Sequence, residues 1–279
     1  MPPAPRRLLI TVAHPDDETF GMGSTIAYYA AQGVEVQVVC ATRGEMGEIA
    51  PGSDATPETL GAVREAELRA GAGIMGVSKV HMLGYRDSGM IPAEDNDDPA
   101  SFVNASEADL MVKLTRLIRD IRPHVVITMA PDGGTGHADH IRISDATTRA
   151  FKLAAHPGYM EPGGLAHAPT KLYYFQIPRS VMRQFMEAVE KKNPSMIKFM
   201  RDAGLERFGV DDDEIAAKID VSAVIETRIK AIKCHASQES PFDMIPEDMV
   251  PMALSTDYFT RGIPGWTGGE PEDELFVGL

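Results

Sequence analysis

The sequence predicts an α/β protein with a Rossmann-like, mostly parallel sheet, helices on both faces, and a helical and irregular C-terminal extension. Short apolar runs rich in β-branched residues alternate with longer segments of helical periodicity between residues 7 and 177. This alternation is typical of a parallel sheet that helices cover on both sides. After Pro178 the alternation stops, so the extension is expected to begin there.

Five apolar runs are predicted to be the strands of this sheet. They lie at residues 7–13, 34–41, 79–83, 124–130 and 171–177. The predicted helices between them carry ordinary start and stop signals. One helix covers 17–32 and ends at Gly33, a second starts at Thr56-Pro57-Glu58 and runs to about Gly76, and a third starts at Ser106 with Asp109.

The extension after Pro178 is predicted to be mainly helical. Helices are expected at 180–193, 194–208 and 222–235, with an acidic turn at 211–214. The tail from Ser240 is rich in Pro and Gly and has weak periodicity, so it is interpreted as a lid or wrap. Residues 1–279 are therefore expected to form one domain, with an α/β core at about 6–177 and the extension at about 178–279.

Composition excludes several classes of protein. The chain has 279 residues and a formal net charge of −14, which leaves no electrostatic footprint for nucleic acid or an anionic membrane. No apolar run approaches the ~20 residues of a membrane span, so membrane insertion is not expected. Two cysteines rule out a disulfide scaffold, and a reducing cytoplasm is the simplest location. The expected partner is a small molecule, and homo-oligomer formation stays open.

The first predicted strand ends in a cluster of polar groups, His14-Pro15-Asp16-Asp17-Glu18. The plain interpretation is a helix N-terminus, where acidic residues complement the helix dipole. That interpretation leaves His14 without a role.

The fourth predicted strand ends in a glycine-rich turn that leads to His137, Asp139 and His140. The plain interpretation is a flexible turn with two surface histidines. However, both polar clusters follow strands of one parallel sheet, so both lie at the same edge. If the two strands are neighbours, one His and one Asp from the first loop can meet one His from the second.

Two imidazoles and one carboxylate suit Zn²⁺, and three protein ligands leave a position open for water. An open position is typical of a catalytic site, and the spare acid and base groups suit metal-assisted hydrolysis. Fe²⁺ could occupy the same donor set.

The sequence resembles the PIG-L/LmbE-like zinc-dependent N-deacetylases. The resemblance rests on AHPDDE at 13–18 and GHADH at 136–140, each after a predicted strand. It extends to TRGEMGEI at 42–49, REAEL at 64–68, RDSGM at 86–90 and KCHASQ at 233–238. The RDSGM segment and the ending DELFVGL are most similar to the mycothiol-pathway deacetylase and amidase branch.

The resemblance implies a role for each matching residue. His14, Asp17 and His140 would bind the metal, and Asp16 would be the general base. Protonated His137 would stabilise the oxyanion, and Asp139 would orient His137 or raise its pKa. The positions where mycothiol-type members contact substrate are Glu48, Arg64, Asp87 and Met90.

Three positions depart from the family pattern, and two of them, Thr135 and Gly21, leave the substrate open. Ala138 stands where the family usually has proline, Thr135 replaces a tyrosine of some members, and Gly21 replaces a lysine of the amidase branch. The expected activity is metal-dependent removal of an N-acetyl group from a GlcNAc-type sugar conjugate. The alternatives are a mycothiol-conjugate-like amidase, another metal hydrolase such as a phosphoesterase, and a non-catalytic Rossmann-like protein that binds metal or sugar. For His235, a helix-end role and a role in the site are equally compatible with the sequence.

Overall fold

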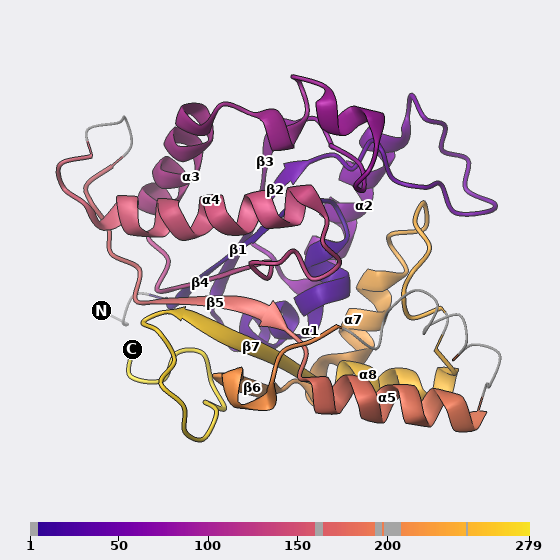
Figure 1. The fold of residues 1–279 in the computed structure, drawn as a ribbon. Helices are drawn as coiled ribbons and strands as arrows, with labels where there is room; N and C mark the ends of the chain where they lie inside the picture. The colour runs from indigo at the N-terminus through magenta and orange to yellow at the C-terminus, as the bar shows by residue number, and fades with distance from the viewer. Residues whose placement is uncertain (1–4, 160–163, 193–196, 198–207, 244) are drawn as a thin grey trace.

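The computed structural model describes residues 5–159, 164–192, 197, 208–243 and 245–279. Within these residues a seven-stranded sheet has the order β3-β2-β1-β4-β5-β7-β6 (Figure 1). β1 to β5 pair in parallel, whereas β7 runs antiparallel to both β5 and β6. The strands are β1 (Arg7–Val12), β2 (Glu35–Thr42), β3 (Lys79–Tyr85), β4 (Val125–Thr128), β5 (Lys171–Gln176), β6 (Ala217–Asp220) and β7 (Thr256–Ile263).

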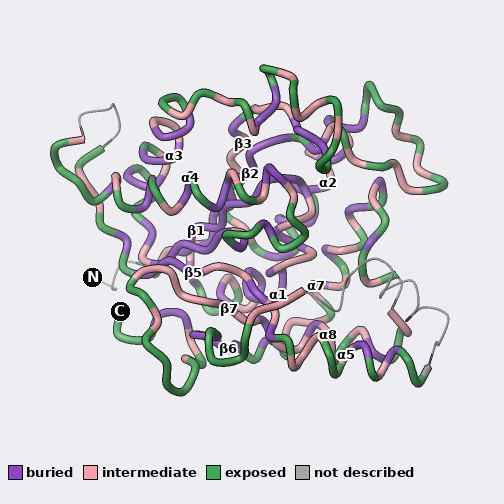
Figure 2. Tube along the Cα trace, viewed as in Figure 1, coloured by how far each residue is buried: buried purple, intermediate pink, exposed green. Residues whose placement is uncertain are grey.

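Helices cover both faces of the sheet, as the sequence predicts. On one face, Ile26, Leu68 and Ala231 pack with the central strands, and they come from α1 (Asp17–Ala31), α2 (Leu60–Met75) and α7 (Ile225–Ile232). On the other face, Leu114 and Ile143 belong to α3 (Glu107–Ile121) and α4 (Ala138–Ala155). Figure 2 shows that the central strands are buried between these layers.

The remaining helical elements are short or lie in the C-terminal part. α5 (Arg179–Lys192) packs through Met186 and Val189 against Met249, which precedes α8 (Val250–Leu254). The 3-10 turns are Glu94–Asp97, Phe102–Asn104, Asp212–Glu214, Ser222–Val224 and Glu247–Met249. Among the described residues, no helix has the length and apolar character needed to cross a membrane.

The C-terminal part joins the sheet, although its sequence pattern does not predict strands there. The tail after Ser240 was expected to be only a lid or wrap, but it supplies β7, which lies between β5 and β6. In β7 the buried side chains of Asp257 and Phe259 alternate with partly exposed ones. Polar residues therefore dilute the apolar signal, and β6 has only four residues, too few for a clear period.

Helix boundaries match the expectations with two differences. Ser106 caps α3 as predicted, because its Oγ accepts the N–H of Asp109 at 3.4 Å. Thr56 does not cap α2: its carbonyl accepts the N–H groups of Thr59 and Leu60 in a turn that precedes the helix. In the segment expected to be one helix at 222–235, the α-helix proper covers only 225–232. The helix expected at 194–208 falls almost wholly outside the described residues.

Candidate active site

The polar clusters of the first and fourth strands lie at the same edge of the sheet. β1 and β4 are parallel neighbours, with Ile10 opposite Ile127 and Thr11 opposite Thr128. The chain after β1 therefore places His14 beside the turn that leads from β4 into α4. This arrangement confirms the condition on which the predicted metal site depends.

His14, Asp17 and His140 meet at this edge. His14 Nδ1 lies 3.2 Å from His140 Nε2, and His140 Nε2 lies 3.2 Å from Asp17 Oδ1. All three candidate ligand atoms lie within 4.8 Å of one another. Two imidazole nitrogens and a carboxylate oxygen at these separations match the donor set of a three-ligand zinc site.

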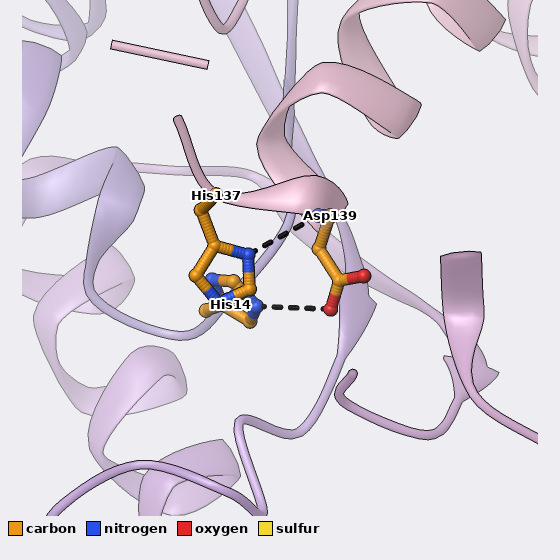
Figure 3. A group of neighbouring side chains, drawn as sticks. All are labelled: His14, His137 and Asp139. Carbon is orange, nitrogen blue, oxygen red and sulfur yellow. Dashed lines mark hydrogen bonds and ion pairs between the residues drawn. The ribbon is translucent and has the colours of Figure 1, made fainter. Parts of the chain in front are cut away.

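The second nitrogen of each imidazole faces an acceptor. His140 Nδ1 lies 3.1 Å from the carbonyl oxygen of Gly133, and His14 Nε2 lies 3.2 Å from Asp139 Oδ2 (Figure 3). Asp87 Oδ1 lies 3.4 Å from the same His14 nitrogen. Such acceptors fix the tautomer of a metal-binding histidine and leave its other nitrogen free to bind the ion.

The cluster carries strong electrostatic coupling. Burial alone would raise the pKa of Asp17, but His140 and His14 hold it well below its usual range. Burial alone would lower the pKa of His14, but hydrogen bonds to Asp139, Asp17 and Asp87 raise it well above its usual range. The carboxylates therefore concentrate negative charge around the imidazoles, which favours a bound cation.

His137 is held differently from what the resemblance implies. It is the N-cap of α4, and its Nδ1 accepts the backbone N–H of Asp139 at 3.1 Å (Figure 3). Burial, together with His14 and His140, lowers the pKa of His137 to about 4. The charge of Asp139 acts in the expected direction and raises this pKa, but burial and the two neighbouring imidazoles outweigh it. A neutral His137 whose Nδ1 accepts carries its proton on Nε2, where it can donate a hydrogen bond.

The carboxylate of Asp139 contacts His14 rather than His137. Asp139 is fully buried, and its Oδ2 also accepts the N–H of Ser88 at 3.0 Å. The atoms of His14, His137 and Asp139 lie close enough to form a second candidate metal group. This second group shares His14 with the first, and its carboxylate is fully buried.

Asp16 lies between the three candidate metal ligands and α2, and its backbone conformation is uncommon. Its φ is 119°, in a region that favours glycine, and such strain costs about 1–3 kcal/mol. Arg64 Nη2 donates to Asp16 Oδ2 at 2.9 Å. Burial raises the pKa of Asp16, Arg64 opposes this rise, and the result is a pKa of about 7. A carboxylate with this pKa suits general-base chemistry near neutral pH.

The four predicted substrate contacts divide into two pairs. Glu48 and Met90 are exposed on the loops after β2 and β3, and Met90 is 51% exposed. Arg64 and Asp87 are only 4% and 3% exposed. Arg64 also donates to the carbonyl oxygens of Gly44 and Pro15, both at 2.8 Å. A substrate role for these four residues stays a prediction.

Two residues of this region received no firm role from the sequence. Glu18 accepts the backbone N–H of Asp16 at 3.1 Å, although its plain interpretation was a helix-dipole acid. His235 lies 3.4 Å from Glu18 and is fully buried there rather than capping a helix end. The only signal for His235 was the KCHASQ match, since residues 18 and 235 come from distant parts of the chain.

Together, the fold and the site define an α/β protein with a candidate metal centre at the carboxyl ends of its parallel strands. Residues 9–151 match the family model of PIG-L, described as GlcNAc-PI de-N-acetylase. The chain belongs to this family, as the two motifs indicate.

Relatives with established names cover nearly the whole chain. One from Geodermatophilus obscurus is 37% identical and covers 98% of each chain, and one from Streptomyces griseus is 36% identical and covers 98% of this chain and 89% of its own. Both are named 1D-myo-inositol 2-acetamido-2-deoxy-alpha-D-glucopyranoside deacetylase. The solved structure of N,N'-diacetylchitobiose deacetylase from Pyrococcus horikoshii has the same fold, with a TM-score of 0.64 and 20% identity. That match covers 92% of this chain and 84% of the other.

Proposed function

We propose that this protein is a metal-dependent hydrolase that removes the N-acetyl group of a GlcNAc-type sugar conjugate. The observation that carries the proposal is the convergence of His14, Asp17 and His140 beside the carboxylate of Asp16. The donor set fits Zn²⁺, with Fe²⁺ as the other candidate. When bound, the metal would lower the pKa of a water molecule and polarise the amide carbonyl.

The side chains around the candidate metal ligands supply the other steps of amide hydrolysis, namely proton transfer and stabilisation of the oxyanion. In its ionised form, Asp16 accepts a proton from the attacking water and later returns it to the departing amine. Neutral His137 donates a hydrogen bond from Nε2 to the developing oxyanion. Asp139 and Asp87 hold the ring of His14 in place. Reaction of the amide therefore produces acetate and a free amine on the sugar.

We propose that the substrate joins the amino sugar to a polyol such as inositol. The two relatives at 36% and 37% identity are named for an inositol-linked sugar of this kind, which supports the choice. Glu48 and Met90 are exposed at the same edge and are proposed to contact the polyol. Arg64 and Asp87 are nearly buried. Their proposed contacts are therefore limited to those substrate groups that lie next to Asp16 and His14.

The test combines metal analysis with an assay of amine release. The protein is loaded with Zn²⁺ or Fe²⁺ and given GlcNAc-inositol, free N-acetylglucosamine and a mycothiol conjugate. Fastest release of amine and acetate from GlcNAc-inositol supports the proposal. Preference for the mycothiol conjugate would indicate the amidase alternative, and metal binding without turnover of any substrate would indicate a binding protein.

A further inference from the structure

Glu18 is a fully buried carboxylate that directly follows the two aspartates of the first loop. Its Oε2 accepts the backbone N–H of Asp16 at 3.1 Å, and its Oε1 accepts the hydroxyl of Thr19 at 2.6 Å. Donors from the protein therefore engage both carboxylate oxygens. A buried carboxylate in this position links the backbone of Asp16 to a side chain in the first turn of α1.

His235 continues this link from the C-terminal part of the chain. Its Nε2 lies 3.2 Å from Thr19 Oγ1 and 3.4 Å from Glu18 Oε1. Since the Thr19 hydroxyl donates to Glu18, the His235 ring is assigned as the donor to Thr19. Gly71 of α2 packs against the same ring, because a Cβ added there would lie 3.2 Å from Nε2. The ring is thus enclosed between α1 and α2.

The turn at Asp16 needs support because its backbone is strained. A non-glycine residue at φ 119° persists only where its surroundings determine the conformation. Arg64 supplies part of this support by binding the carbonyl oxygen of Pro15 and the carboxylate of Asp16. Glu18 adds to this support by accepting the N–H of Asp16. Arg64 and Glu18 therefore hold the two polar atoms of the peptide bond that precedes Asp16, while the Asp16 carbonyl accepts N–H groups from the first turn of α1.

We propose that Glu18 and His235 form a positioning pair that fixes the backbone of Asp16, and hence its carboxylate, for the reaction proposed above, on which this inference rests. Neither residue acts on the substrate directly. His235 lies outside residues 9–151, the part that matches the family model. The C-terminal part thus contributes to the geometry of the catalytic turn. A misplacement of about 1 Å at such a group can lower the rate ~10²-fold.

The experiment compares Glu18→Ala and His235→Ala with the milder Glu18→Gln and His235→Gln. Glu67→Gln is the matched control, because Glu67 of α2 holds the same C-terminal segment through the N–H and hydroxyl of Ser237. In the folded, metal-loaded fraction, both Ala variants should lower kcat by ~10- to 100-fold with little change in KM or bound zinc. Glu18→Gln should recover part of the loss, since its amide oxygen can accept the Asp16 N–H. The control should retain wild-type kcat.

A second measurement follows the backbone directly. Amide hydrogen exchange at Asp16, measured by NMR on the full chain with and without zinc, should be faster in both Ala variants and unchanged in Glu67→Gln. Unchanged exchange at Asp16, or equal losses of kcat in the control, would overturn the inference. If the wild-type protein releases no amine from any conjugate, the proposed function fails, while the exchange result still decides whether the pair positions Asp16.

Discussion

Arg64 Nη2 donates a hydrogen bond to Asp16 Oδ2 at 2.9 Å, and the two side chains are 5% and 15% exposed. Arg64 belongs to α2, whereas Asp16 lies in the turn between β1 and α1. The pair therefore joins the general-base candidate to a helix that does not carry the metal cluster. Burial raises the pKa of Asp16, and the guanidinium restrains this rise to about 7.

This relationship predicts a pH dependence of the rate. A general base acts only when it is unprotonated, so kcat/KM of the wild type should fall as the pH decreases through about 7. Arg64→Met removes the cation that lowers the pKa of Asp16, so this acid limb should move to higher pH. Arg43→Met is the control, since Arg43 pairs with Glu65 on the exposed side of α2. An acid limb at the same pH in wild type and Arg64→Met would contradict the assignment.

Asp16→Asn tests the base itself. Asparagine keeps the shape of the side chain but cannot accept a proton, so the variant should fold and bind zinc normally. Its kcat should fall by ~10²–10⁴-fold, the usual contribution of a general base. The measurement is amine release per bound zinc. Turnover near the wild-type rate would show that another group takes the proton.

The placement of the metal cluster was predictable because it depends on local sequence and one topological rule. Parallel strands end at the same edge, so loops after the first and fourth strands can share a site when those strands are neighbours. β1 and β4 are neighbours, and His14, Asp17 and His140 lie together. No comparable rule predicts which side chain a buried carboxylate will contact. Asp139 lies two residues from His137 in sequence, yet its carboxylate contacts His14.

The C-terminal part was harder to predict because tertiary contacts determine its structure. β7 lies next to β5 although Arg179–Lys192 and β6 separate them along the chain. Its polar residues are accommodated by specific partners, such as the buried ion pair of Asp257 with Arg228. The contact between His235 and Glu18 likewise depends on the packing of α7 against α1 and α2. Periodicity carries no information about contacts of this kind.

Metal content is expected to follow the three candidate ligands. His14→Ala, Asp17→Ala and His140→Ala each remove one donor atom from the cluster and should lose most of the bound zinc. His137→Ala is the control, because its ring accepts the Asp139 N–H and is not part of this donor set. Metal analysis after gel filtration gives the stoichiometry. If His137→Ala loses zinc and Asp17→Ala retains it, the second candidate group would be the metal site.

Arg228→Met is predicted to lower stability strongly. Arg228 is 2% exposed, and its Nη1 lies 3.1 Å from Asp257 Oδ1. It also donates to the carbonyl oxygens of Thr19, Phe20 and Gly21, next to the non-helical Met22 of α1. Removing one partner of a buried ion pair leaves an uncompensated charge, which costs about 3–5 kcal/mol.

The free energy of unfolding in urea measures this effect. Arg43→Met serves again as the control, because an exposed ion pair contributes only about 0–1 kcal/mol. A loss below about 1 kcal/mol in Arg228→Met would show that the contact with Asp257 contributes little.

A comparison of kcat/KM on two substrates tests whether an exposed residue at the site contacts the substrate. Glu48 is exposed on the loop after β2, so Glu48→Gln should weaken only contacts with the part of the conjugate beyond the amino sugar. Its kcat/KM should fall by about tenfold for GlcNAc-inositol, the loss of roughly one hydrogen bond to a charged group, and stay unchanged for free N-acetylglucosamine. Glu58→Gln, on the exposed turn before α2, is the control.

For Arg64 the sequence and the structure predict different results. The sequence resemblance predicts that Arg64→Ala harms the conjugate more than the free sugar, because remote binding energy helps to orient the reacting amide. The contacts in the structure predict equal losses on both substrates, because the guanidinium binds Asp16 and two backbone carbonyls. The values of kcat/KM for both substrates in both proteins decide between them. Equal losses would make Arg64 a positioning residue for Asp16, whereas a loss confined to the conjugate would make it a substrate contact.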